Sequence, residues 1–495
     1  MTAFITHVDQ GWSGHVQEER CLEHRIAHLW GVRPLEFVNG WKHSTRSQAH
    51  KLHSICSYMA MFPPSIPHYF IEKCTQPGDM VLDPFCGRGT TPLEACLSGR
   101  IGVGNDLNPV AYYLTKAKIR VPAYDRVLSR LQQLEEGYKP LSEAKCLLDS
   151  YRELSKDAAE IQQSKPSGNP GLDRAAWEHL TALIRELREL YVRCDPNMPY
   201  FMSQDYDFRK ERAEDIGYNE SFHHKIWLFY HPETLRQLVY LKRNLGSQPE
   251  DEFIKALVLG IMHGRGKHYL SLPMPNTFSM TPRYVLAYSY KNMLILPEKN
   301  VFDCLRRKMA LIDPLPAAYV QGAAFSCDIR NLPDALEPFL ESAGQKPKLL
   351  VSSPPYLGVV KYGQYNWIRL WFLEEHDSPP SQDGHREKSL EETVDAVLDD
   401  GHHDLESYLK FMRESLEAVL RVMAPKSISA WVIGDVGDLN LAEAVWEQSA
   451  RPLGGYRKLG IIADEIDEGK KVTKIWGTER GRATKIDRIL ILERC

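Results

Sequence analysis

The sequence has 495 residues, 43% of them hydrophobic, and carries a formal net charge of −4 at pH 7, so a nucleic-acid partner would have to meet local positive surfaces. Its longest apolar runs are far shorter than the roughly 20 residues that cross a bilayer, and its N-terminus has no signal-peptide pattern, so we expect a cytoplasmic protein of two or three domains. Its ten cysteines lack C-x-x-C spacing, which argues against a zinc site and against a disulfide framework.

The first clear element along the chain is a short apolar run. Residues 1–45 show no pattern that indicates an element, whereas Met80–Leu82 lead to Asp83 and then to two closely spaced glycines. We expect a strand here, followed by a tight loop in which Gly87 and Gly89 let a ligand approach the backbone.

A helix and a second strand are expected next. Thr91 is placed to cap the helix and Glu94 to complete a capping box. The strand Ile101–Gly104 then leads to Asp106, nineteen residues after Gly87. A glycine loop at a helix N-terminus, followed about 20 residues later by a carboxylate, is the nucleotide-binding arrangement of doubly wound α/β folds, in which the acid binds ribose hydroxyls. The spacing is not G-x-G-x-x-G and no P-loop lysine is present, which disfavours dinucleotides and nucleoside triphosphates.

The middle of the chain is predicted to be a mostly helical insertion, residues 122–315, that holds target specificity. Helical stretches at 124–163 and 172–192 flank an exposed linker at 164–171. Residues 225–291 contain nine Lys and Arg against four Asp and Glu, interleaved with aromatic residues. This pattern suits a nucleic-acid surface, and it equally suits a solvated helix face over an aromatic core.

Five strands are expected in the second half of the chain, at 323–327, 347–352, 428–434, 456–463 and 485–492. Asp328 directly follows the first of these strands. A long amphipathic helix over 404–423 leads into the third. No helix of normal length separates the last two strands, so they are predicted to form an antiparallel hairpin.

The strand at 347–352 leads into a second motif, S-P-P-Y at Ser353–Tyr356. Together with D-P-F-C-G-R-G-T-T at residues 83–91, it resembles the catalytic and cofactor loops of the N4-cytosine and N6-adenine DNA methyltransferases. The resemblance covers roughly residues 54–116 and 323–492. Both motifs follow expected strands, where α/β sheets bind ligands.

The resemblance implies an α/β fold of the class I S-adenosylmethionine-dependent methyltransferase type, with a Rossmann-like sheet. The first part of this core, with the cofactor loop, would be residues 1–121, and the second part, with the catalytic loop and hairpin, residues 316–495. The insertion at 122–315 would be the DNA target-recognition region.

The chemistry of amino methylation fits the residues of the second motif. The lone pair of an exocyclic amine is delocalised into the base, so acceptors for the amino hydrogens are needed, and the Ser353 hydroxyl and the Pro354 carbonyl can provide them. Pro355 stiffens the loop and Tyr356 can stack on a base that has been flipped out of the duplex. A cytosine-C5 enzyme would instead need a cysteine where Pro355 stands.

The resemblance also implies a set of binding residues. Asp106 would hold the cofactor ribose, Asp328 the adenine amino group, and Asp83 would lie near the methionine end. The expected contacts to S-adenosylmethionine are Phe62, Asp83, Phe85, Gly87, Gly89, Thr90, Asp106 and Asp328. The expected DNA contacts are Arg265, Lys267, Lys361 and Arg369. No metal site is expected.

The two motifs are compatible with more than one target base. Serine at the head of P-P-Y favours cytosine-N4, whereas a cofactor loop that precedes the catalytic loop is also found among adenine-N6 enzymes. RNA as substrate, and a non-catalytic nucleic-acid binder on the same scaffold, are further alternatives. The resemblance implies double-stranded DNA as the partner, with a cognate restriction enzyme or other defence protein beside it.

Overall fold

The computed structural model describes residues 49–58, 63–163, 174–199, 226–264, 268–272, 285, 288–289, 291–357, 362–374, 404–435, 439–465 and 486–495. Within these residues, a seven-stranded sheet has the order β3-β2-β1-β4-β5-β7-β6. Its strands are β1 (Met80–Asp83), β2 (Ile101–Asn105), β3 (Ala323–Phe325), β4 (Leu349–Ser352), β5 (Ile428–Gly434), β6 (Tyr456–Glu465) and β7 (Ile486–Arg494).

The pairing within the sheet identifies the fold. Strands β1 to β5 are parallel, whereas β7 runs antiparallel to both β5 and β6. The last two strands therefore form the expected hairpin, and β7 lies between β5 and β6 in the sheet. A parallel sheet that reverses direction only at this hairpin is the class I methyltransferase fold, so the α/β prediction is confirmed.

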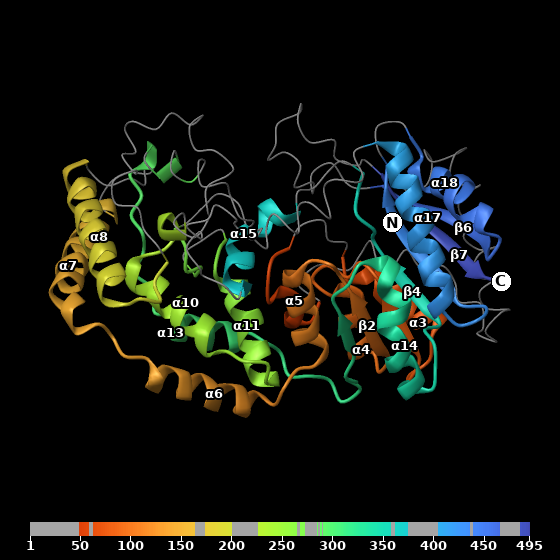
Figure 1. Ribbon diagram of the computed structural model, residues 1–495, viewed down its shortest axis with the longest axis horizontal. Helices are drawn as coiled ribbons and strands as arrows, with labels where there is room; N and C mark the ends of the chain where they lie inside the picture. Colours follow the sequence, from red (N-terminus) through yellow and green to blue (C-terminus); the bar gives the residue numbers. More distant parts are fainter. Residues whose placement is uncertain are drawn as a thin grey trace, which may run out of the picture.

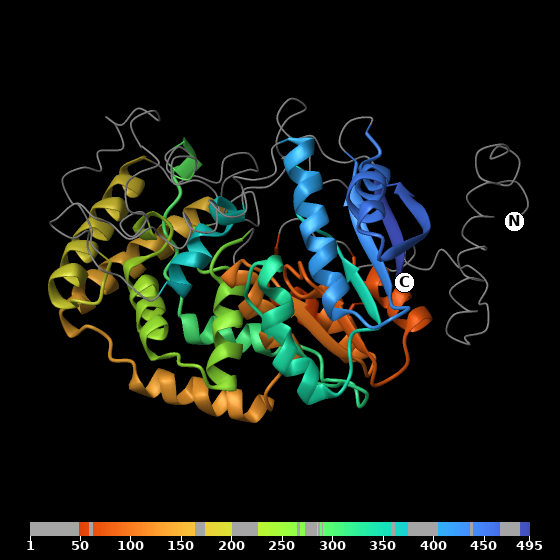
Figure 2. The same cartoon turned by 45° about the vertical axis from the view of Figure 1, so that its right-hand side comes forward.

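Helices cover both faces of the sheet. On one face, Val81 and Val351 pack with α3 (Ser65–Cys74) and α4 (Thr90–Leu97). On the other face, Leu82 and Leu350 pack with α14 (Leu332–Ala343), α17 (Leu405–Val422) and α18 (Leu441–Val445). The residues divide between the two faces because successive side chains along a strand point to opposite sides of the sheet. Figures 1 and 2 show α17 beside the β6–β7 pair.

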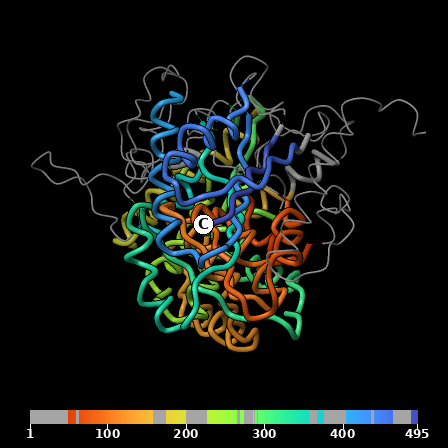
Figure 3. Tube along the Cα trace, turned by 90° about the vertical axis from the view of Figure 1, so that its right-hand side faces the viewer, coloured from red at the N-terminus to blue at the C-terminus, as the bar shows by residue number. Residues whose placement is uncertain are grey.

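The described part of residues 122–315 is helical and contributes no strand to the sheet. Its helices are α6 (Tyr124–Gly137), α7 (Lys145–Gln163), α8 (Arg174–Cys194), α10 (Pro232–Asn244), α11 (Pro249–Ile261) and α13 (Val301–Met309). They lie at one end of the molecule, with α7 and α8 farthest from the sheet, and the C-terminus lies at the opposite end (Figures 1 and 3).

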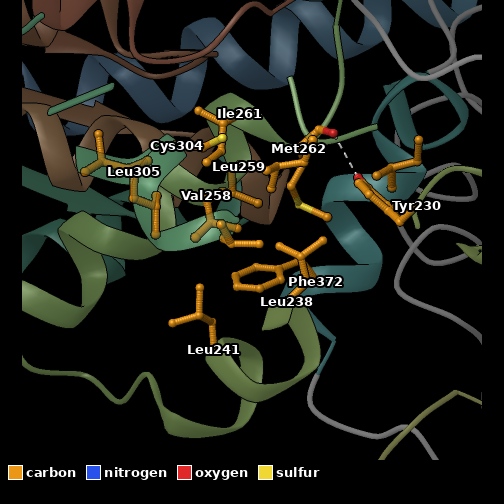
Figure 4. Close-up of a cluster of buried hydrophobic side chains, with 14 of the residues drawn as sticks. Tyr230, Leu238, Leu241, Val258, Leu259, Ile261, Met262, Cys304, Leu305 and Phe372 are labelled. Carbon is orange, nitrogen blue, oxygen red and sulfur yellow. Dashed lines mark hydrogen bonds between the residues drawn. The ribbon is translucent and has the colours of Figure 1, made fainter. Parts of the chain in front are cut away.

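One hydrophobic core joins these helices to α5 (Pro109–Ile119) and to α15 (Tyr362–Leu373), which follows the S-P-P-Y motif. Figure 4 shows part of it, with Leu238, Val258 and Phe372 meeting from α10, α11 and α15. The first turn of α11 adds three ion pairs, Glu250–Arg126 (2.9 Å), Asp251–Arg130 (2.7 Å) and Glu252–Lys116 (2.5 Å). The inserted helices are thus packed firmly against the methyltransferase core.

The aromatic residues at the start of the basic stretch belong to this core. Trp227, Phe229 and Tyr230 are fully buried, and the Tyr230 hydroxyl donates to the Met262 carbonyl (3.0 Å). For these residues the interpretation as a nucleic-acid surface is wrong, because packing of the inserted helices takes their rings out of solvent. Within the described residues, no helix has the length and apolar character needed to cross a membrane.

Candidate active site

Two loops meet at the C-terminal edge of the sheet. The cofactor loop follows β1 and the catalytic loop follows β4, and these strands are neighbours, with Val81 opposite Leu349 and Leu82 opposite Leu350. The resulting closeness places the D-P-F-C-G-R-G-T-T motif beside the S-P-P-Y motif, although more than half of the chain separates them.

The glycines of the cofactor loop adopt conformations that other residues rarely adopt. Gly87 has φ +50° and Gly89 has φ +76°. A Cβ on Gly89 would lie only 3.0 Å from the backbone of Thr115, so a side chain there would require α5 to move. The loop therefore passes close to α5, and its Gly87 N–H donates to Asp106 Oδ2 (2.8 Å).

The helix after this loop begins differently from the prediction. Helix α4 starts at Thr90, with Gly89 in the left-handed conformation at the N-cap and no side-chain cap. The Thr91 hydroxyl donates instead to the Val351 carbonyl on β4 (3.0 Å), and Glu94 binds two histidines. The predicted capping box is wrong, because the side chains of Thr91 and Glu94 both form hydrogen bonds with residues distant in the sequence.

Asp106 lies at the end of β2 with both carboxylate oxygens bound by backbone amides. Oδ2 accepts from Gly87 and Oδ1 from Asn108 (2.9 Å). The residue is nevertheless partly exposed. Burial raises the pKa of the carboxyl to about 6. The amides fix its orientation, and each oxygen keeps a lone pair that a ligand hydroxyl can use.

Asp83 is almost fully buried, with 1% of its surface exposed. Its Oδ1 accepts from the Ser352 hydroxyl (2.6 Å) and from the Phe85 N–H (3.2 Å). Burial raises the pKa of Asp83 to about 7, against the opposing effect of these hydrogen bonds. Its two hydrogen-bond donors within the described residues, the Ser352 hydroxyl and the Phe85 N–H, are both uncharged.

Asn105 is a site residue that the sequence reasoning missed. Its side chain is buried, and its Nδ2 donates to the carbonyls of Pro84 (3.2 Å) and Cys327 (3.0 Å). Its Oδ1 accepts from the Cys327 N–H (3.1 Å). The side-chain amide of Asn105 therefore connects the loops that follow β1 and β3. Its place directly before Asp106, at the end of a strand, was the available signal.

Asp328 follows β3 as expected, but internal partners engage its carboxylate. It accepts from the Arg330 N–H (2.9 Å) and forms a two-pronged pair with the Arg330 guanidinium (2.8 and 2.6 Å). These hydrogen bonds lower the pKa of Asp328. Its contact with a cofactor remains a prediction, and such a contact would have to share the carboxylate with Arg330.

The remaining cofactor-loop candidates lie around this edge. Thr90 is buried at the start of α4, and the half-buried Phe85 packs against Phe411 of α17, with ring centroids 5.6 Å apart. Phe62 lies outside the described residues. Phe85 is thus held between the cofactor loop and the helical layer on one face of the sheet.

The catalytic-loop residues lie together at the end of β4. The Ser353 hydroxyl donates to the Tyr356 hydroxyl (3.3 Å), and Ser353, Pro355 and Tyr356 are all partly exposed, whereas Pro354 is buried. Burial and the nearby charge of Asp487 raise the pKa of Tyr356, so its hydroxyl stays protonated at neutral pH. The loop offers a hydroxyl acceptor beside an aromatic ring.

The prediction that Arg369 contacts DNA is wrong. Only 1% of its surface is exposed, and its guanidinium donates to the Leu259 carbonyl (3.0 Å) and to Asn366 Oδ1 (3.1 Å). It braces α15 against α11 instead of facing solvent. The other expected DNA contacts, Arg265, Lys267 and Lys361, lie outside the described residues.

Comparison with known proteins finds similarity to DNA methyltransferases. A model of the DNA methylase family of N6 and N4 methyltransferases matches residues 12–117. The type II methyltransferase M.MjaII of Methanocaldococcus jannaschii is 23% identical over 385 residues, which cover 72% of this chain and 69% of that protein.

Two further relatives match shorter segments. The type II methyltransferase M.MthZI of Methanothermobacter thermautotrophicus is 33% identical over 93 residues, which are 19% of this chain and 26% of that protein. The type II methyltransferase M.XycI of Xanthomonas campestris pv. cyanopsidis is 37% identical over 75 residues, which are 15% of this chain and 24% of that protein. The rRNA methyltransferase aviRa of Streptomyces viridochromogenes aligns over 93% of this chain and 94% of its own, at 10% identity and a TM-score of 0.26, which is too low to bear on the fold. In its two motifs, its sheet order and its match to the family model, the chain is similar to the N6-adenine and N4-cytosine DNA methyltransferases.

Proposed function

We propose that this protein is a site-specific DNA methyltransferase that transfers a methyl group from S-adenosylmethionine to the N4 amine of a flipped-out cytosine. The observation that carries the proposal is the junction of the two loops. The Ser352 hydroxyl binds Asp83 (2.6 Å), so Ser353–Tyr356 stand directly beside the D-P-F loop. A methyl donor held by one loop would thus lie next to a base held by the other.

The residues at the sheet edge fit the proposed cofactor. S-adenosylmethionine carries an ammonium group and a ribose diol, and it supplies an electrophilic methyl group. Asp83 offers a buried carboxylate that forms no ion pair within the described residues, and Asp106 offers oriented acceptors for the diol. The left-handed conformation of Gly87 lets the chain pass close to the ligand.

The S-P-P-Y loop would orient the amine. The Ser353 hydroxyl and the Pro354 carbonyl accept the two amino hydrogens, which leaves the nitrogen lone pair free to point at the methyl group. The Tyr356 ring stacks on the base, and its protonated hydroxyl accepts the hydrogen bond of Ser353 when no base is bound. Because the amine is paired in duplex DNA, the base must leave the stack first.

The identity of the base is the finer part of the proposal. Serine at the head of the P-P-Y loop favours cytosine-N4, and adenine-N6 is the second candidate because the cofactor loop precedes the catalytic loop. The relatives are type II methyltransferases, which supports a place in a restriction-modification system, with a cognate restriction enzyme as partner. The helical region at 122–315 is proposed to read the target sequence, with Arg265 and Lys267 on DNA phosphates.

The reaction is tested by expressing the chain in a host that lacks DNA methylation. Nucleoside mass spectrometry of the host DNA should detect N4-methylcytosine, and the Tyr356→Ala variant should leave almost none, because the base loses its stacking partner. N6-methyladenine would select the second candidate. 5-Methylcytosine would contradict the mechanism, since Pro355 stands where that chemistry needs a cysteine. Methylated RNA with unmodified DNA would move the substrate to RNA.

A further inference from the structure

Ser352, the residue before the S-P-P-Y motif, is completely buried at the end of β4. Its hydroxyl donates to Asp83 Oδ1 across the β1–β4 pair, at 2.6 Å. A serine on a strand needs no such bond for the strand to form. A short bond to a carboxylate that is itself 1% exposed therefore calls for an explanation in the site.

Among the residues that the structure describes, the hydroxyl of Ser352 donates a hydrogen bond to Asp83 at 2.6 Å. Thr91 also lies near this carboxylate, but its hydroxyl donates to the Val351 carbonyl (3.0 Å), and a hydroxyl has one hydrogen to give. The Phe85 N–H reaches the same Oδ1 atom at 3.2 Å. Two donors thus fix the position of Oδ1.

Two other titratable groups near Asp83, both within the described part of the chain, are Asp106 and Cys86, and neither carries positive charge. Asp106 lies near it and repels its ionised form. The Cys86 thiol also lies close, and burial raises the pKa of that thiol far above neutral pH. Removal of the Ser352 hydroxyl would therefore free the carboxyl to rotate and would favour its protonated form.

We propose that Ser352 is a positioning residue for the cofactor: its hydroxyl holds Asp83 in the orientation that binds the ammonium group of S-adenosylmethionine. The inference rests on the proposed function and deepens it. It assigns separate tasks to the two adjacent serines, because Ser352 acts on the cofactor through Asp83, whereas Ser353 contacts the amine of the base.

The test measures S-adenosylmethionine binding to the full chain by calorimetry between pH 5.5 and 8.5. Ser352→Ala should weaken binding about tenfold at pH 7, since a hydrogen bond to a charged group is lost. Without this hydrogen bond Asp83 takes up a proton more readily. As the pH is lowered, the variant should therefore lose affinity for S-adenosylmethionine at a higher pH than the wild type does. Ser352→Thr restores the hydroxyl and should restore both the affinity and the pH profile.

Two matched variants distinguish positioning from a general loss of stability. Ser449→Ala removes an equally buried hydroxyl, which donates to the Leu409 carbonyl (2.7 Å) and not to Asp83, and it should leave the cofactor affinity unchanged. Ser353→Ala should lose DNA methylation and keep cofactor binding. The inference is overturned if the wild-type chain binds S-adenosylmethionine and Ser352→Ala binds it equally well with the same pH profile, or if Ser449→Ala loses as much affinity. A wild-type chain that binds no S-adenosylmethionine would instead overturn the proposed function.

Discussion

Asp106 shows how much of the site one residue can carry. Its two oxygens hold the glycine loop and the start of α5 through the amides of Gly87 and Asn108. The residue remains partly exposed at the C-terminal edge of the sheet, where the proposed ribose would lie. Asp106 therefore has a structural role in the loop and a proposed role in cofactor binding.

Asp106→Ala should weaken S-adenosylmethionine binding roughly tenfold or more, because charge-assisted hydrogen bonds to the ribose are lost. Calorimetry on the full chain measures this change. Asp334→Ala, which removes an exposed carboxylate on α14, is the control and should bind as the wild type does. An unchanged affinity in Asp106→Ala would remove this residue from the cofactor site.

Among the helices, α3 and α4 are joined through one carboxylate, Glu94. Its Oε1 accepts from His53 Nε2 (2.6 Å) and its Oε2 from His68 Nδ1 (3.1 Å). Burial alone would raise the pKa of Glu94, but the hydrogen bonds from the two histidines outweigh burial and lower it to about 2. These two hydrogen bonds therefore hold the segment before β1 against the helix that follows the cofactor loop.

The hydrogen bonds to Glu94 predict that the stability of the fold depends on pH. The hydrogen bond to Glu94 raises the pKa of the half-exposed His68 above 6.5, with Glu72 adding to the effect and burial and Arg100 opposing it. A raised histidine pKa stabilises the fold below the unfolded value and loses this effect as the pH rises through the folded value.

His68→Gln should therefore lower the free energy of unfolding at pH 5.5 by under about 1 kcal/mol, given the exposure of the ring, and by much less at pH 8.5. Urea denaturation of both proteins at the two pH values measures the difference. An equal loss at both pH values would mean that the charge of His68 does not contribute. Below about pH 4.5, the wild type should also lose stability as Glu94 takes up its proton.

Across the whole molecule, the catalytic loop spans two cores. Strand β4 belongs to the sheet, whereas α15, which follows the loop, packs with the inserted helices. Arg369 fixes α15 to this second core through the Leu259 carbonyl and reaches Ser57 Oγ at 3.4 Å. The position of the loop therefore depends on the fit between the insertion and the sheet.

Arg369→Met should lower the free energy of unfolding by about 2–4 kcal/mol, because buried acceptors lose their donor. Chemical denaturation measures the loss. Arg451→Met, which breaks an exposed pair with Glu447 one helical turn away, is the control and should cost under about 0.5 kcal/mol. Unchanged stability together with a shallower salt dependence of DNA binding would restore Arg369 as a phosphate contact.

The sequence by itself determined the two loops and the strands that carry them. Strands β1 and β4 and the β6–β7 hairpin lie where their apolar runs predicted them, because burial on both faces of a sheet demands such runs. The glycines and acids of the cofactor loop are local patterns, so they were readable without the fold. The assignment of Asp106 to the edge of the sheet followed in the same way.

Only the tertiary structure decided which partner each polar side chain has. Thr91 donates to Val351, 260 positions away, instead of capping its own helix, and Glu94 binds His53 and His68 instead of completing the cap. Arg369, expected on DNA, is buried between helices. A side chain bonds to whatever lies within about 3 Å of it, and this neighbourhood is created by the packing of segments distant in sequence, which a local pattern does not contain.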